Sequence, residues 1–143
     1  MDNKDFINHI REIMLSLRNC KPNFHIEESV KGMFPVLKIL YDEEDVTPKD
    51  IEDKLSVSSA RIARVLNQLE EKKLVERTKS LNDKRKTIVV LTEEGKEIAL
   101  KHRCDMYNFF DLMLKNITDE EKDEFIFLME KMVNNIKGGN NNA

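Results

Sequence analysis

The chain has 143 residues, of which 40% are hydrophobic and 36% charged, and a net charge of −3. This length fits one domain, or one domain with an added oligomerisation element. Only four glycines and three prolines among so many charged residues favour a mainly helical fold with long amphipathic faces. No apolar run approaches the roughly 18 residues of a membrane span, and no secretory signal is visible. Two widely separated cysteines without an export signal lead us to expect a cytoplasmic protein.

The first predicted element is an amphipathic helix over residues 3–19. The Lys21-Pro22 pair should end it, because the residue before a proline avoids the helical region. Its apolar residues recur at helical spacing and form one wide stripe. They are Phe6, Ile7, Ile10, Ile13, Met14 and Leu17.

A second helix is predicted from about Ser29 to Asp42. Pro35 lies awkwardly inside it, because a proline within a helix removes a hydrogen bond and costs about 3 kcal/mol. We therefore expect either a kink or a late helix start. The acidic run at 42–45 then leads into the next elements.

Residues 47–71 have the pattern of a helix-turn-helix. Thr47 can cap a short helix in which Pro48 takes the first position, where its missing N–H costs nothing. A break at residues 56–58 follows, and Ser58 or Ser59 can cap a longer second helix. Two helices joined by about three residues form the helix-turn-helix arrangement. The second helix has its apolar stripe at Ile62, Val65, Leu66 and Leu69.

A basic hairpin is predicted directly after this pair of helices. Residues 74–78 and 87–91 are β-branched runs, and residues 80–86 between them combine turn-forming residues with a basic tip. Residues 58–87 contain nine Lys/Arg and four Asp/Glu, hence +5, so the rest of the chain carries −8. A basic island in an acidic protein indicates a site for a polyanion, although charge runs are commonly just solvated faces.

Two long helices are predicted after the hairpin. Thr92 can cap the first, which runs to about Lys115, with Glu93 and Glu94 near its positive end. Thr118 and Glu121 form a capping box that begins the second. Residues 138–143 are expected to be a disordered tail.

Two spaced motifs stand out in this central region, Asp83-Lys84-Arg85 in the hairpin and Leu91-Thr92-Glu93-Glu94-Gly95 at its end. They resemble the winged-helix core of the MarR family, whose signature is D-x-R in the wing followed by L-T-x-x-G. Gly32-Met33-Phe34-Pro35-Val36-Leu37 is similar to a G-Q-F-P-x-L run of some members, with Met33 in place of Gln. The similarity covers roughly residues 32–98. It implies a winged helix-turn-helix protein that binds double-stranded DNA.

We therefore predict a mainly α fold with a small β-hairpin wing. Residues 1–28 are assigned to an N-terminal dimerisation helix and linker, 29–92 to the DNA-binding core and 93–137 to C-terminal dimerisation helices. The amphipathic helices outside the core need a surface to cover their apolar stripes, and a homodimer interface supplies one. The resemblance implies the same arrangement, in which terminal helices of both subunits interdigitate.

The candidate DNA contacts lie in the first turn of the second helix and at the wing tip. Arg61 can donate two hydrogen bonds to guanine O6 and N7, or it can remain a solvated charge. Arg85 suits the minor groove. Arg77 and Lys79 at the base of the wing can add phosphate contacts. The resemblance implies that Asp83 supports the wing by orienting Arg85. The predicted DNA-binding residues are Ser58, Ser59, Ala60, Arg61, Arg64, Lys84, Arg85 and Lys86.

Candidate sites for a regulatory signal are less specific. Cys20 beside Lys21 could act as a redox sensor, as in some relatives, or be an inert cysteine at a helix end. His9, His25 and His102 are dispersed, so we predict no metal site and no cofactor. One set of apolar residues has two interpretations: a pocket for a small aromatic ligand, as many relatives have, or ordinary core packing. Its lining would be Met33, Phe34, Met106, Phe109, Phe110 and Met113.

The combined prediction is a homodimeric repressor of a pseudo-palindromic operator, relieved by a small-molecule or redox signal. The alternative is a winged-helix module for protein–protein contact whose basic face docks an acidic partner. An enzyme is rejected, because the sequence has no Gly-rich phosphate loop, no clustered His/Cys/Asp set and no nucleophile beside a base. The operator, the inducer and the choice between repression and activation stay open.

Overall fold

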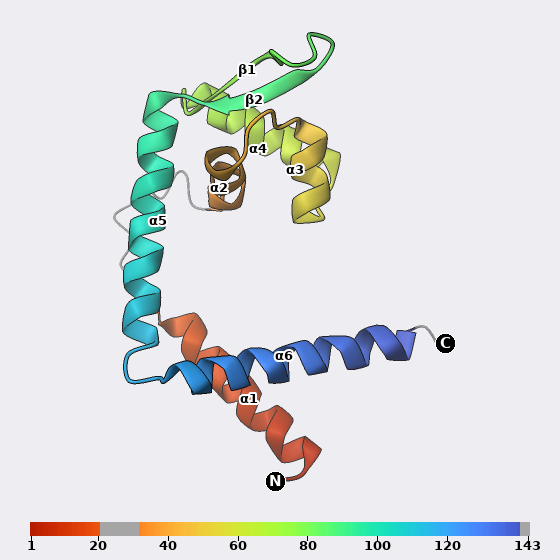
Figure 1. The fold of residues 1–143 in the computed structure, drawn as a ribbon, viewed down its shortest axis with the longest axis vertical. Coiled ribbons are helices and arrows are strands. Elements are labelled where there is room, and N and C mark those ends of the chain that lie inside the picture. Colours follow the sequence, from red (N-terminus) through yellow and green to blue (C-terminus); the bar gives the residue numbers. More distant parts are fainter. Residues whose placement is uncertain (21–31, 141–143) are drawn as a thin grey trace. The chain divides into compact units, whose positions relative to one another are not determined.

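The computed structural model describes residues 1–20 and 32–140 (Figure 1). These ranges are mainly helical and contain one two-stranded antiparallel hairpin, as predicted. The chain forms two compact units, Met1–Phe109 and Phe110–Ala143. The elements are α1 (Asn3–Asn19), α2 (Phe34–Asp42), α3 (Pro48–Leu55), α4 (Ser59–Glu71), β1 (Val75–Lys79), β2 (Thr87–Leu91), α5 (Glu93–Met113) and α6 (Asp119–Asn140).

The hydrophobic core lies between α2, α3, α4 and the hairpin, with a contribution from the start of α5 (Figure 1). The predicted stripe of α4 points into it: Ile62, Leu66 and Leu69 are almost completely buried, and Val65 packs at its edge. Burying such side chains is worth about 1.5–3 kcal/mol each, so this core holds the helix-turn-helix rigidly. Leu37, Ile51 and Leu74 are also among the largest fully buried side chains.

Local hydrogen bonds fix the ends of α3 and α4, and they include the expected cap at Thr47 and one at Ser58. Thr47 and Asp50 form a capping box at the start of α3, with Pro48 in its first turn. Ser56 ends α3 in the left-handed conformation, with φ of 51°. Ser58 then caps α4 by accepting the backbone N–H of Arg61 at 3.3 Å. The turn between the helices is therefore short and closely defined.

The structure decides between the two alternatives for α2, a kink at Pro35 or a late start of the helix. The helix begins at Phe34 with Pro35 in its first turn, so the late start is confirmed and a start near Ser29 is wrong. Gly32 precedes it in a turn with φ of +91°, a conformation that glycine adopts without strain. Proline is tolerated in a first turn because the N–H it lacks has no partner there. Residues 29–31 lie outside the described part of the chain.

The hairpin is anchored to the α2–α3 link at two points. The backbone N–H of Val89 in β2 donates to the carbonyl of Val46 at 2.8 Å. Ser80, only 1% exposed, donates its hydroxyl to Asp45 and accepts the backbone N–H groups of Asn82 and Asp83 at 3.2 Å. These bonds fix the base of the wing on the core.

The L-T-x-x-G run joins β2 to α5 and the turn before β1. The Thr92 hydroxyl donates to the Lys73 carbonyl at 2.7 Å and accepts the Gly95 N–H at 3.0 Å. A Cβ on Gly95 would lie 2.0 Å from the Leu74 carbonyl oxygen. The motif therefore needs a hydroxyl at its second position and no side chain at its last.

The terminal helices follow the sequence closely, with two differences at their ends. Thr118 and Glu121 form the predicted capping box of α6. The preceding helix α5 ends at Met113, slightly before the predicted Lys115, and Asn116 adopts φ of 66°. The last helix, α6, continues to Asn140, so the tail expected from residue 138 does not begin there. Two glycines weaken a helix without ending it, because each costs only about 1 kcal/mol.

Candidate nucleic-acid interface

The first turn of α4 presents a polar, exposed surface on a rigid support. Ser58, Ser59, Ala60, Arg61 and Arg64 are all exposed, as a surface for a partner requires. Ile62, between the two arginines, is 2% exposed and fixes the rotation of the helix. The free N–H groups and the helix dipole also make this end of α4 electrostatically positive.

Ser59 has an intramolecular partner that sequence reasoning missed. Its hydroxyl donates to the carboxylate of Glu52 on α3, with 2.9 Å between Oγ and Oε2. The Glu52 side chain is only 14% exposed and lies 3.7 Å from the Lys49 ammonium. This bond joins the two helices beside the surface that is predicted to meet DNA.

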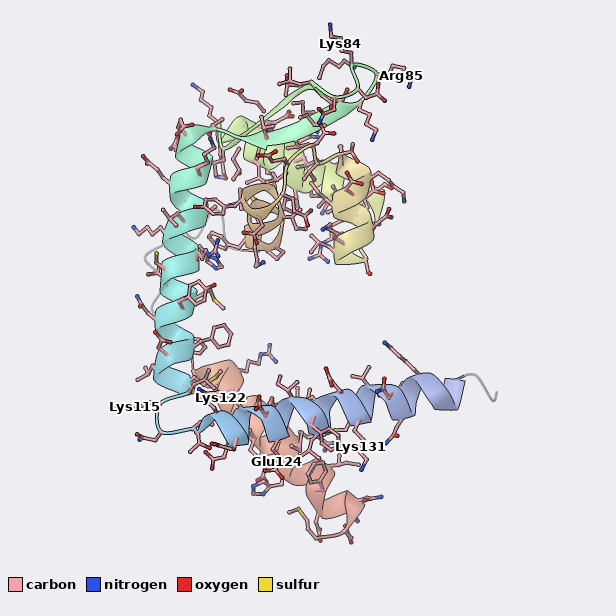
Figure 2. All side chains as sticks on the ribbon, in the orientation of Figure 1. Lys84, Arg85, Lys115, Lys122, Glu124 and Lys131 are labelled. Carbon is pink, nitrogen blue, oxygen red and sulfur yellow. The ribbon has the colours of Figure 1, made fainter. Side chains whose placement is uncertain are left out.

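The wing tip carries exposed positive charge. Lys84 and Arg85 extend away from the hairpin at its tip (Figure 2), and the Arg85 side chain is 92% exposed. Lys86 is exposed beside them. The wing therefore has the charge and exposure that contact with a polyanion requires.

Asp83 is hydrogen-bonded to Arg85, the residue that the family resemblance implied it would orient. Its Oδ1 accepts the backbone N–H of Arg85 at 3.0 Å and the guanidinium Nε at 3.2 Å. The backbone N–H and then the guanidinium hold the pKa of Asp83 below its usual value, with a smaller contribution from Lys86. The carboxylate therefore stays ionised and stabilises the turn in which Arg85 lies.

The two basic residues at the base of the wing interact within the fold. Arg77 of β1 pairs with Glu70 at 2.5 Å and donates to the side-chain oxygen of Asn67 at 3.0 Å, both on α4. Lys79 donates to the Thr87 hydroxyl at 3.0 Å. We expected both to add phosphate contacts, but the structure shows Arg77 tying the wing to α4.

The residues of the predicted effector pocket differ in their surroundings. Met33 and Phe34 are each 8% exposed in the core, and the Phe34 ring stacks on His102 of α5 with centroids 3.7 Å apart. Burial there lowers the pKa of His102, partly opposed by Asp105. Core packing thus explains Met33 and Phe34, while the pocket stays a prediction. Met106 and Phe109 are half-buried, and Phe110 begins the second unit.

The remaining candidates are the cysteines and a possible metal site. Cys20 and Cys104 are both exposed, and Cys20 is the residue that follows the last turn of α1. Within residues 1–20 and 32–140, no three metal-binding side chains come together. Over the same residues, no helix is long and apolar enough to cross a membrane. Redox sensing by Cys20 stays a prediction.

Comparison with known proteins identifies the family. The MarR family matches residues 32–87, which contain the helix-turn-helix and most of the wing. The regulator YwhA of Bacillus subtilis is 30% identical over 104 residues, which cover 73% of each chain. The chain belongs to the MarR family. Two further regulators of this bacterium are similar, YdgJ with 34% identity over 71% of this chain and the repressor YetL with 30% over 69%.

The matched region spans 62% of the length of YdgJ and 60% of YetL. These relatives are named transcriptional regulators, a class of protein without enzymatic activity.

Solved structures of MarR-type regulators share this fold over most of the chain. A MarR/EmrR-family regulator from Acinetobacter sp. ADP1 has a TM-score of 0.67 and 24% identity, covering 96% of this chain and 99% of its own. PcaV of Streptomyces coelicolor, solved with its natural ligand, has a TM-score of 0.68 and 17% identity, covering 94% of this chain and 96% of its own. At these identities the similarity shows the winged-helix fold alone.

Proposed function

We propose that this MarR-family protein is a homodimeric transcriptional repressor that binds a pseudo-palindromic operator in the cytoplasm. The observation that carries the proposal is the presence of two exposed DNA-facing features on one rigid core. These are the first turn of α4 and the basic wing tip, both anchored by buried residues. A helix in the major groove and a wing beside it would read adjacent parts of one half-site.

The distribution of charge supports a polyanionic partner. The basic segment 58–87 stands against a net charge of −3 for the chain, so general attraction to DNA is confined to this segment. Several positive side chains at the wing tip would neutralise phosphates and make binding depend steeply on salt. The guanidinium of Arg61 adds donors that match the acceptor pair of guanine.

Exposed apolar helix faces support the dimer. Every residue of α1 is exposed, and α6 likewise exposes a long apolar series. Contiguous exposed apolar surface of this extent is unusual for a monomer and is typical of an interface. A two-fold dimer would place two recognition helices about 34 Å apart, one turn of DNA. The exposed apolar residues of these helices include Phe6, Ile10, Ile13, Leu17, Phe125, Leu128, Met132 and Ile136.

Contacts between α2 and α5 suggest how a signal could reach the DNA-binding core. Besides the Phe34–His102 stack, Arg103 of α5 pairs with Asp42 at 3.4 Å and lies over the Tyr41 ring at 5.8 Å. A shift of α5 would therefore move the core with it. A ligand or an oxidant would act through its different affinity for the two arrangements. The relative YetL, which is named a repressor, supports repression as the direction of control.

The test is binding to the DNA upstream of the gene, titrated over salt with nonspecific DNA as competitor. We expect a dimer to protect a pseudo-palindrome, with affinity falling steeply as salt rises. Arg61→Ala should weaken specific binding by about 1–3 kcal/mol and relax one base position, whereas Lys101→Ala on α5 should change neither. Uniform loss across all sequences would make Arg61 a phosphate contact. Weak binding without sequence preference would favour the protein-docking module instead.

A further inference from the structure

Two consecutive serines at the start of α4 have opposite hydrogen-bonding polarity. Ser58 uses its oxygen as an acceptor for the Arg61 N–H, which leaves its own proton available. Ser59 uses its proton as a donor to Glu52, at 2.9 Å, which leaves its lone pairs available. A serine hydroxyl has one donor and two acceptor sites, so Ser58 keeps its donor and one acceptor site, whereas Ser59 keeps acceptor sites only.

Glu52 is well placed to keep Ser59 in this orientation. An ionised carboxylate is only an acceptor, so it can receive the Ser59 proton but cannot offer one. Its side chain is only 14% exposed, and Lys49 at 3.7 Å is a weak second partner. Turning the Ser59 proton away would leave a sheltered carboxylate oxygen without that bond, which is costly.

This polarity determines what Ser59 can contact on DNA. Phosphate oxygens accept hydrogen bonds and do not donate them, so they suit Ser58 and not Ser59. In the major groove the donors are the N6 amino group of adenine and the N4 amino group of cytosine. We infer that Ser59, oriented by Glu52, is a specificity-determining residue that selects adenine or cytosine at one position of each half-site. This rests on the proposed function, with the first turn of α4 in the major groove.

Arg61 and Ser59 would have complementary tasks in the same turn of α4. Arg61 has only donors and would select the acceptor edge of guanine. Ser59, two positions earlier, would accept from an amino group. Glu52 does not touch the base in this scheme and is a positioning residue.

The experiment is selection of bound duplexes from a library in which both half-sites are randomised, followed by sequencing. The wild-type protein should enrich adenine or cytosine at one symmetric position. Ser59→Ala should reduce that enrichment by about fivefold, the effect of one typical hydrogen bond, and leave the guanine position unchanged. Ser59→Thr keeps the hydroxyl and should retain the preference, which shows that the helix start still folds.

Glu52→Gln tests the orienting role. The glutamine amide can donate to Ser59, so the Ser59 proton is no longer fixed and the preference for amino-bearing bases should fall towards that of Ser59→Ala. Asp53→Asn is the matched control: it removes one charge from the same helix at a side chain that is 64% exposed and pairs with Lys49. It should alter overall affinity through charge alone and leave the base preference intact.

The double variant Ser59→Ala/Glu52→Gln separates the two residues. If Glu52 acts through Ser59, the second substitution should not change base preference further. A further change in base preference would show that Glu52 contacts the base itself. An unchanged preference in Ser59→Ala would show that Ser59 does not read the base. Either result overturns the inference and leaves the proposed function as a regulator intact. A wild-type protein that selects no sequence would overturn the proposed function together with it.

Discussion

Replacing Gly95 by alanine should destabilise this protein strongly, although alanine is the better helix former. Gly95 lies in the first turn of α5, where the helix passes directly over the turn before β1. A Cβ there would stand 2.0 Å from the Leu74 carbonyl oxygen, 3.0 Å from its carbon and 3.2 Å from Leu91 Cδ2. The first distance is far inside any real contact, so the backbone must move.

The expected cost follows from what the backbone would lose. Overpacking of a core costs about 1–3 kcal/mol, and a backbone carbonyl, which cannot rotate away, belongs at the upper end. The same Leu74 oxygen accepts the Thr92 N–H at 3.0 Å, so its displacement threatens a bond worth about 1 kcal/mol. The helical preference for alanine offsets at most about 1 kcal/mol. We expect a net loss of about 3 kcal/mol of unfolding free energy.

The assay is urea unfolding at one fixed protein concentration, because an oligomer's stability depends on concentration. With a slope of about 2 kcal/mol/M, the midpoint for Gly95→Ala should fall by roughly 1–2 M. Gly138→Ala in α6 is the matched control, since its Cβ would meet nothing within 4 Å. It should be neutral or slightly stabilising. If Gly95→Ala is as stable as this control, the steric explanation of the motif is refuted.

Three further predictions concern the fold and the wing. Thr92→Val should lower unfolding stability by about 1–2 kcal/mol in urea because two hydroxyl bonds are lost, while Thr92→Ser should not; equal stability of the valine variant would contradict the capping role. Leu69→Ala should cost about 2–5 kcal/mol in thermal unfolding, whereas Leu81→Ala, at a side chain 96% exposed, should cost almost nothing. Because the pKa of Asp83 is lowered by its bonds to Arg85, their stabilising effect is present above the usual aspartate pKa and is lost as pH falls through the lowered one. The Arg85 amide signal should therefore titrate below the usual aspartate range, and Asp83→Asn should abolish that titration.

Features that depend on neighbouring residues were predictable from the sequence. The caps at Thr47, Ser58 and Thr118 each join residues three positions apart, so their patterns are visible in the chain. The Asp83–Arg85 bond is also local, and the resemblance to the MarR family suggested its purpose. Pro35 allowed a kink or a late start, and only the structure decides between them.

Features that join distant residues escaped prediction. Ser80 and Asp45 are 35 positions apart, and no local pattern in the sequence shows that this hairpin serine is buried and bonded to Asp45. Arg77 looked like one more charge for DNA, but α4 brings Glu70 and Asn67 to it. Ser59 was expected to contact DNA, but its orientation by Glu52 depends on the angle between two helices.

The hydrogen bond from Val89 to the Val46 carbonyl bears on how the protein avoids self-association through its wing. A two-stranded hairpin that projects from a core offers an open strand edge, which is a template for strand addition by another chain and for aggregation. The bond to Val46 occupies the middle of the outer edge of β2, and Lys84, Arg85 and Lys86 at the tip repel the same tip of another copy. The wing can therefore stay extended and accessible to a polyanion while resisting edge-to-edge pairing with copies of itself.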